Sequence, residues 1–307
     1  MGYDLPVRPS FSPAQRTVGI CRAAVHPVLR VSGPDRSSAQ RWVGQAGVRS
    51  RLNQHYYGLD DPLANSMLTG SWGKGLAVRS RRDIDVMFLL PDTVLSRFNQ
   101  RVGNRQSQIL QEVRSVLSVA YGLQTEMRGD QQAVVVRFST TPVDVVPGFR
   151  ARYGQVWICD TRYGGTYRLA DPVMEMDSLN TSDARHQGVT RIIIRAIKQW
   201  QRHCNAPLRS FQVERLVIEF MHTQSGVYFW PDSLVRDFFG WLITRPSASI
   251  IMPGTLEVVA LGNAWRSRAE TAWRNACIAC DHERAGQNLE AGAAWQKVFG
   301  TMIPLVA

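Results

Sequence analysis

Two aspartates at the head of an apolar run are the residues best suited to catalysis. Asp83 and Asp85 flank the first residue of Ile84–Leu90, a short run rich in branched and aromatic residues that indicates a buried strand. Side chains alternate along a strand, so both carboxylates are expected on one side, about 6.6–6.8 Å apart along the chain. Such carboxylates repel each other and lose hydration, and a divalent cation removes both costs. A pair of magnesium ions on oxygen ligands can assist phosphoryl or nucleotidyl transfer, whereas the alternative is a strand end with two solvated aspartates.

A glycine-rich turn precedes the aspartates. Gly70 and Ser71 open it, Gly73 and Gly75 follow, and Asp83 comes twelve residues after Ser71. The backbone N–H groups of such a turn and the serine hydroxyl can bind a phosphate. The stretch is not a Walker loop, because the chain has no G-x-x-x-x-G-K-[ST] segment. This combination favours nucleotide chemistry over a solvated strand end.

The Gly-Ser turn followed by D-x-D on a strand resembles the signature of the polymerase-beta-like nucleotidyltransferase superfamily. The resemblance implies a third carboxylate on a neighbouring strand, and Asp144 between valines is the candidate. Residues 133–138 are the expected partner strand, and residues 139–142 the turn between them. Asp130 is a competing acid, but it lies in a polar turn and is expected to be solvated.

Composition sets the broad class. The chain has 307 residues, 44% hydrophobic and 20% charged, as expected of a globular protein large enough for two domains. We find no apolar run of transmembrane length and no signal-peptide pattern, so a cytoplasmic location without membrane contact is expected. The net charge of +11 favours nucleotides or nucleic acid as partners. Cys277 and Cys280 have zinc-ligand spacing, but no second pair accompanies them, and core packing is the preferred interpretation.

The elements around these motifs predict an α+β protein. Residues 1–160 are expected to hold an extended N-terminal arm, a long helix from about Ser37 to Tyr57 and the nucleotidyltransferase core with a mixed sheet. Helices are also expected at about 93–102 and 105–121. Residues 161–307 are expected to form a helical nucleotide-binding domain, so that the active site lies in a cleft between two lobes. Its predicted elements are a turn-rich connector at 163–172, helices at 183–204 and 232–244, a helix capped by Ser210, and a helix at 263–299.

Motifs in the second half narrow the resemblance. They look like those of the bacterial cGAS/DncV-like nucleotidyltransferases (CD-NTases), the second-messenger synthases of CBASS anti-phage systems, and the similarity covers nearly the whole chain after about residue 37. One departure is Leu76, where relatives commonly carry threonine; it affects loop contacts rather than a metal ligand. The segments that carry the resemblance are Asp171-Pro172, Asn180, Lys198-Gln199-Trp200, residues 208–214 and residues 295–300.

The resemblance assigns roles to single residues. Asp83, Asp85 and Asp144 would bind two Mg²⁺ ions, with Mn²⁺ as a substitute, and Asp144 would help to deprotonate the attacking hydroxyl. The residue types themselves leave structural roles open for two of these positions. Ser210 is also a good helix cap, and Phe211 is also a candidate core residue. Lys198 belongs to a row of basic residues with Arg191, Arg195 and Arg202, which is either a solvated face or a phosphate-facing stripe. The expected nucleotide-binding residues are Gly70, Ser71, Asn180, Lys198, Ser210 and Phe211.

The implied reaction is attack of a ribose 2′- or 3′-hydroxyl on the α-phosphate of a nucleoside triphosphate, with release of pyrophosphate. Repetition and ring closure give a cyclic di- or trinucleotide that would act on a downstream effector in anti-phage defence. One alternative is template-independent transfer to RNA or to a small acceptor, and another is an inactive nucleotide- or RNA-binding module. The sequence leaves the base, ring size, linkage, activating signal and oligomeric state open.

Overall fold

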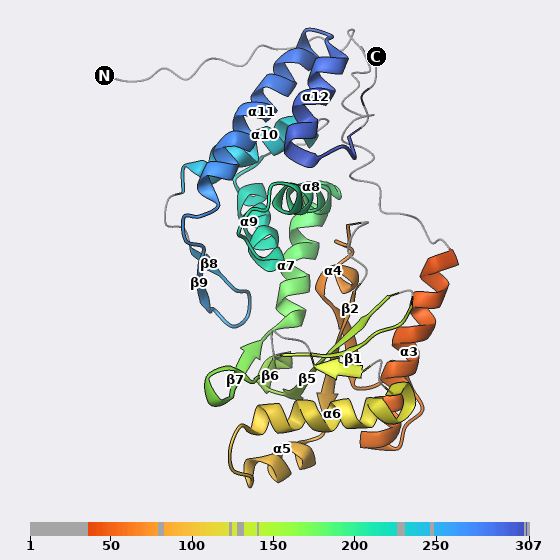
Figure 1. The fold of residues 1–307 in the computed structure, drawn as a ribbon. Coiled ribbons are helices and arrows are strands. Elements are labelled where there is room, and N and C mark those ends of the chain that lie inside the picture. Colours follow the sequence, from red (N-terminus) through yellow and green to blue (C-terminus); the bar gives the residue numbers. More distant parts are fainter. Residues whose placement is uncertain are drawn as a thin grey trace.

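A mixed β-sheet with covering helices forms one half of the molecule, and a bundle of helices forms the other (Figure 1). The computed structural model describes residues 36–78, 83–122, 125–127, 132–139, 141–225, 231–245, 249–303 and 305. The predicted N-terminal arm and the turn with Asp130 lie outside these residues. The predicted α+β class is confirmed.

The sheet has seven strands and places the D-x-D strand near its centre. The order is β1-β2-β5-β4-β3, and β6 and β7 continue from β5. β2 pairs with β5 in parallel, whereas β1 pairs with β2 antiparallel. The strands are β1 (Ser66–Thr69), β2 (Ile84–Leu90), β3 (Thr125–Met127), β4 (Val134–Val136), β5 (Val143–Arg150), β6 (Val156–Asp160) and β7 (Thr166–Ala170).

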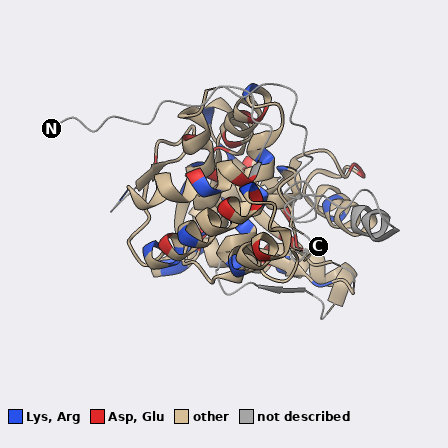
Figure 2. Ribbon diagram, turned by 90° about the horizontal axis from the view of Figure 1, so that it is seen from above, with Lys and Arg blue, Asp and Glu red and all other residues tan. Residues whose placement is uncertain are grey.

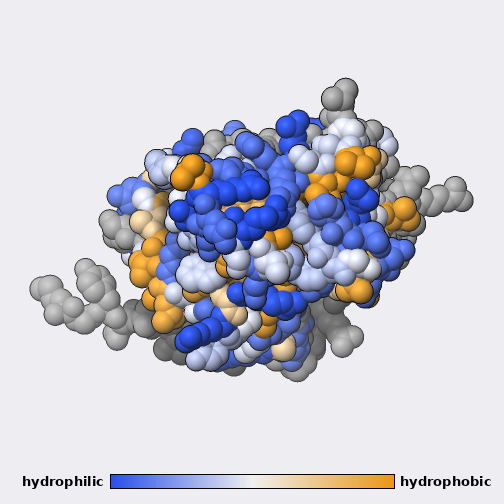
Figure 3. Space-filling model, turned by 90° about the horizontal axis from the view of Figure 1, so that it is seen from below, coloured by the Kyte–Doolittle hydropathy of each residue, from blue (hydrophilic) through white to orange (hydrophobic). Residues whose placement is uncertain are grey.

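The two faces of β2 have different neighbours. Ile84, Val86 and Phe88 belong to a core that includes residues of α3 and α6, as the alternation of side chains along a strand requires. Asp85 and Met87 lie on the opposite face. The helices of this half are α3 (Arg36–Tyr57), α4 (Gly70–Gly73), α5 (Asp92–Asn99) and α6 (Arg105–Tyr121). α3, α5 and α6 correspond to predicted helices, whereas α4 is a single turn within the predicted glycine-rich turn. Seen from below, where α5 and α6 lie, the surface is largely hydrophilic with small separate hydrophobic patches (Figure 3).

A second core fills the helical half. Three tryptophans, Trp200, Trp265 and Trp295, are fully buried there and dominate the packing. Basic and acidic residues are interspersed over the helices seen from above (Figure 2), so the positive net charge is not gathered on one face in this view. The elements are α7 (Pro172–Arg185), α8 (Val189–His203), α9 (Ser210–His222), α10 (Pro231–Ile243), β8 (Ser249–Ile251), β9 (Val258–Ala260), α11 (Arg266–Arg284) and α12 (Asn288–Phe299).

Three predicted elements of this half are wrong. The expected connector at 163–172 contains β7, which pairs antiparallel with β6, so the sheet runs on to Ala170. The helix expected at 183–204 is divided between α7 and α8, because Gln187 and Gly188 adopt φ values of 53° and 87°. The helix expected at 263–299 is divided at Gly286, whose φ is 71°.

None of the helices in the described part of the chain combines the length and the apolarity needed to cross a lipid bilayer.

Candidate active site

Asp85 and Asp144 face each other across neighbouring strands. They are partners in the parallel register of β2 and β5, so their Cα atoms are separated by about one strand spacing of 4.7–4.9 Å and their side chains share one face. Asp144 is 2% exposed, and Asp83 directly precedes β2. The structure therefore brings the sequence-predicted carboxylates of two segments, sixty residues apart along the chain, to one edge of the sheet.

The glycine turn lies directly against this carboxylate pair. Thr69, the last residue of β1, is the register partner of Asp85, and Gly70 then turns the chain with a φ of 58°. A Cβ atom on Gly70 would lie 1.8 Å from Oδ2 of Asp85, and one on Gly73 would lie 2.2 Å from the carbonyl oxygen of Leu68. Only glycine therefore lets the backbone approach the carboxylate so closely.

Lys198 connects this turn to the helical half. It lies on α8 and is 2% exposed, and its Nζ donates to Ser71 Oγ at 3.1 Å and to Glu214 Oε1 at 2.5 Å. Glu214 lies one turn after Ser210 on α9, so the two side chains lie on the same helix face. Ser71 and Lys198 thus meet beside the carboxylates, and Ser210 lies on the α9 face that carries Glu214.

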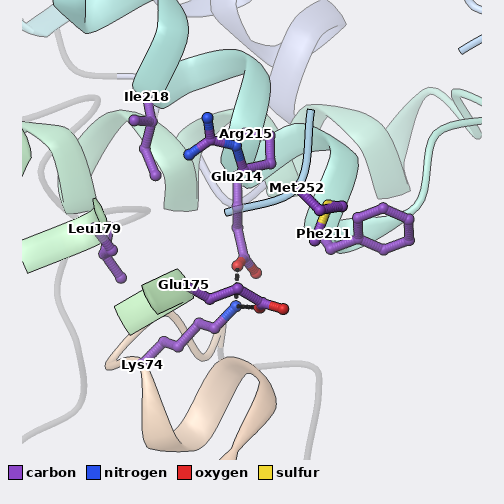
Figure 4. A pocket seen from close by; sticks show the side chains of 8 residues that line it. All are labelled: Lys74, Glu175, Leu179, Phe211, Glu214, Arg215, Ile218 and Met252. Carbon is purple, nitrogen blue, oxygen red and sulfur yellow. Dashed lines mark hydrogen bonds and ion pairs between the residues drawn. The ribbon is translucent and has the colours of Figure 1, made fainter. Parts of the chain in front are cut away.

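A second lysine shares Glu214. Lys74 Nζ donates to Glu214 Oε2 at 3.0 Å and to Glu175 Oε2 at 2.7 Å, so Lys74 lies between two carboxylates (Figure 4). Burial opposes the charged form of Lys74, but Glu214 and Glu175 outweigh it and raise the pKa of the lysine above its usual range. Burial likewise opposes the ionised form of Glu214, but Lys74 and Lys198 hold its pKa below its usual value. The four groups form a charge-neutral network that joins the residue after α4 to α7, α8 and α9.

The basic row on α8 is mostly in contact with the glycine turn. Arg191 Nε donates to the carbonyl oxygen of Lys74 at 3.2 Å, and Arg195 Nη1 donates to that of Gly75 at 3.1 Å. Arg191 Nη2 also donates to Asn180 Oδ1 at 2.7 Å, so Asn180 reaches the turn through this arginine. Together with Lys198 and Ser71, three residues of one helix face bind the turn at three points. The two arginines therefore do not form an ordinary solvated face, because both fasten the turn to α8.

Ser210 and Phe211 begin α9. The helix cap is Arg209 rather than the predicted Ser210, because the side-chain oxygen of Gln212 accepts a hydrogen bond from the Arg209 backbone N–H at 2.7 Å. Phe211 is half-buried against the second core and lines a small pocket with Met252, Lys74 and Glu175 (Figure 4).

The donor set of the carboxylate pair fits magnesium. Every candidate ligand is a carboxylate oxygen, the donor type that Mg²⁺ prefers. Asp144 is buried beside Asp85, and two ionised carboxylates so close together would repel each other without a cation between them. The close approach of Gly70 to Asp85 leaves the site narrow on the side of the turn. Asp83, Asp85 and Asp144 are thus the candidate holders of the metal.

Comparison with known proteins gives the family. The family described as Second Messenger Oligonucleotide or Dinucleotide Synthetase domain (SMODS) matches residues 29–182, which is half of the chain. The chain belongs to this family. The SMODS match contains the glycine turn and all three aspartates, and it confirms the resemblance to the CD-NTases.

Individual relatives agree with this assignment. A probable cyclic nucleotide synthase of Bacillus cereus (strain VD146) is 24% identical over 211 residues, covering 64% of this chain and 63% of the relative. The chain thus matches less than two thirds of that relative's length.

Solved structures share the fold. CdnC of E. coli MS115-1, in complex with HORMA-deltaN, has a TM-score of 0.62 at 18% identity and matches 88% of this chain and 93% of its own. DncV of Vibrio cholerae, in its 3′-deoxy ATP bound form, has a TM-score of 0.62 at 15% identity, covering 78% of this chain and 68% of its own. These similarities confirm the predicted polymerase-beta-like core with an added helical region.

Several contacts of the site were not predicted from the sequence. Lys74, Glu175 and Glu214 form the network, yet none was a candidate, although two of the chain's three lysines meet at Glu214. Lysine is scarce in this chain beside 33 arginines, and this signal marks Lys74 as well as Lys198. Glu214 also lay within a segment used for the resemblance.

Proposed function

We propose that this protein is a metal-dependent nucleotidyltransferase that joins ribonucleoside triphosphates into a cyclic di- or trinucleotide. The observation that supports this most is the meeting of Asp85 and Asp144 in strand register beneath the Gly70–Ser71 turn, with Lys198 on the Ser71 hydroxyl. Carboxylates that can bind a metal thus lie beside hydrogen-bond donors that can bind a phosphate. Membership of SMODS and the resemblance to the CD-NTases support the same reaction.

The triphosphate is proposed to bind between the two halves. Ser71 and the backbone of the glycine turn contact the phosphates from the sheet, and Lys198 and Ser210 contact them from α8 and α9. Phe211, in the first turn of α9, stacks on a base. Asn180 acts through Arg191, which positions the turn rather than the nucleotide. This positioning converts a bimolecular attack into an effectively unimolecular one.

In the proposed reaction the oxygen of a ribose 2′- or 3′-hydroxyl forms a bond to the α-phosphorus. The bond from that phosphorus to the α–β bridging oxygen breaks, and pyrophosphate leaves. Asp144 accepts the hydroxyl proton. Two Mg²⁺ ions, held by Asp83, Asp85 and Asp144, would supply charge neutralisation at the attacking and leaving oxygens when bound.

The product decides the proposal. The full chain is incubated with all four ribonucleotides and Mg²⁺ or Mn²⁺, and phosphatase-resistant products are identified by mass spectrometry. A cyclic di- or trinucleotide is expected, and Asp83→Asn, Asp85→Asn or Asp144→Asn should abolish it without lowering the metal-free melting temperature, because each removes a like charge. Asp177→Asn, at an exposed position of α7, is the matched control and should retain activity.

Other products would overturn the assignment in distinct ways. An extended RNA tail or a labelled small acceptor would indicate another nucleotidyltransferase, and nucleotide binding without pyrophosphate release would indicate an inactive module. We further propose that the product acts on an effector in anti-phage defence, as the CBASS resemblance implies. Solved relatives bound to ATP or 3′-deoxy ATP support nucleoside triphosphates as ligands, whereas the interspersed charge in Figure 2 adds no support for RNA.

A further inference from the structure

A cluster of three potential metal ligands lies outside the candidate active site. Asp232 lies in the first turn of α10, and Cys280 and Glu283 lie in the last turns of α11. One ligand atom from each residue lies within 4.8 Å of the other two. α10 and α11 pack against each other in the helical half, away from the sheet that carries the catalytic candidates (Figure 1). The cluster therefore joins the beginning of one helix to the end of the next.

Asp232 provides an independent sign that a ligand belongs here. The residue is 8% exposed, and its Oδ1 atom is buried and makes no hydrogen bond within the described part of the chain. A buried carboxylate oxygen without a partner is costly, and most such groups in folded proteins are satisfied. Cys280, beside it, is 5% exposed. A bound cation would satisfy the oxygen and neutralise the carboxylate.

The neighbouring arginines each form an ion pair with a carboxylate outside the cluster. Arg236 pairs with Asp237 at 2.7 Å, and Arg284 pairs with Asp281 at 3.0 Å. The indole N–H of Trp295, on α12, donates to Glu283 Oε1 at 2.8 Å. Hydrogen bonds of this kind orient the ligands of metal sites. Three helices thus contribute to the cluster.

We propose that Asp232, Cys280 and Glu283 form a zinc site that fastens α10 to α11. Zinc binds both thiolate and carboxylate ligands with four-fold coordination, whereas magnesium and calcium avoid sulfur. A water molecule would complete the coordination. Binding displaces the thiol proton of Cys280 to solvent and forms the zinc–sulfur bond. The ligand set differs from the Cys-x-x-Cys pattern of the sequence, since Cys277 is not part of the cluster.

Cys277 supplies the matched control, because it lies three residues before Cys280 on the same helix. The full-length protein is purified with zinc present, dialysed and measured for bound metal. About one zinc ion per chain is expected for the unaltered protein and for Cys277→Ser, and Cys280→Ser should lose it. Cobalt replaces zinc in a second measurement, because a thiolate-to-cobalt absorption band reports sulfur ligation and ignores metal bound at the catalytic aspartates.

Stability provides a readout independent of activity. A strong chelator should lower the melting temperature of the unaltered protein and of Cys277→Ser, and leave Cys280→Ser unchanged. Asp232→Asn is the second variant, because it preserves side-chain volume and removes a buried charge, so it should fold without metal and lose the cobalt band. The proposal is overturned if no sulfur–cobalt band forms in the unaltered protein, or if Asp232→Asn and Cys280→Ser bind metal as Cys277→Ser does.

Discussion

Replacing Glu214 by glutamine should destabilise the protein in a way that nucleotide reverses. Glu214 accepts from Lys198 at 2.5 Å and from Lys74 at 3.0 Å, and the three side chains are 10%, 3% and 11% exposed. Removal of one member of a buried ion pair costs about 3–5 kcal/mol, because the partner charge stays buried. Glu175 remains bound to Lys74 in the variant, so we expect about 3 kcal/mol. For a chain of this size this corresponds to a fall in melting temperature of about 6 °C.

The effect should depend on pH in a defined direction. In the folded protein Lys74 and Lys198 hold the pKa of Glu214 below the ordinary glutamate value of 4.5, so its ionised form stabilises the fold fully above that pH. This contribution is lost as the pH falls through the folded-state pKa. The difference in melting temperature between the unaltered protein and Glu214→Gln should therefore shrink as the pH is lowered from 7 to below 4.5.

Nucleotide supplies the second measurement. If Lys198 binds the triphosphate, the negative charge of the triphosphate replaces that of Glu214 beside the two lysines. A nucleoside triphosphate should therefore raise the melting temperature more in Glu214→Gln than in the unaltered protein. Glu219→Gln on the same helix is the control. Its pair with Arg245 is partly exposed, so its loss should cost at most about 1 kcal/mol.

The loss of stability and the nucleotide-dependent shift in melting temperature test different parts of this prediction. A melting temperature equal to that of Glu219→Gln would refute the buried network. A normal loss of stability without the larger nucleotide shift would refute the triphosphate clamp and leave the network intact.

Three further substitutions test the site. Phe211→Ala should weaken nucleotide binding by about 1–3 kcal/mol and Phe211→Tyr should retain it, in isothermal titrations, whereas a lower melting temperature with unchanged affinity would make Phe211 a core residue. Lys198→Ala should weaken triphosphate binding far more than monophosphate binding when both are measured in an Asp83→Asn background; equal losses would return Lys198 to a structural role. Gly70→Ala should lower the melting temperature and abolish activity, because its Cβ would lie 1.8 Å from Asp85 Oδ2. Gly58→Ala is the control, because Gly58 has a similar φ of 67° but a Cβ there would have no atom within 4 Å. Similar losses in both variants would mean that backbone strain, not the contact with Asp85, is decisive.

Local patterns predicted the sheet half of the site well. Strand β2 and the valines around Asp144 are short-range signals, and the Gly-Ser turn fixes their meaning once the resemblance is considered. The register that pairs Asp85 with Asp144 is not local, and the sequence predicted only that their strands are neighbours. These positions could therefore be named from the sequence, while their catalytic roles stay predictions.

The contacts between the halves could not be predicted in the same way. Lys74 and Glu214 are 140 residues apart, and no local pattern states that a lysine in a turn meets a glutamate on a helix. Helical periodicity also misplaced the start of α8, because the apolar spacing that predicts this helix begins only at Val189. Gly188, directly before it, is the local signal for the break.

The three-point attachment of the glycine turn to α8 bears on what the smallest functional unit is. The SMODS match ends at residue 182, before Arg191, Arg195 and Lys198, so a fragment with those limits retains the three aspartates that are candidate magnesium ligands. It lacks the helix that binds Ser71 and the carbonyl oxygens of Lys74 and Gly75. In such a fragment the carboxylates would remain in register while the phosphate-binding turn lost its support. The segment that identifies the family is therefore shorter than the segment needed to hold its phosphate-binding turn in place.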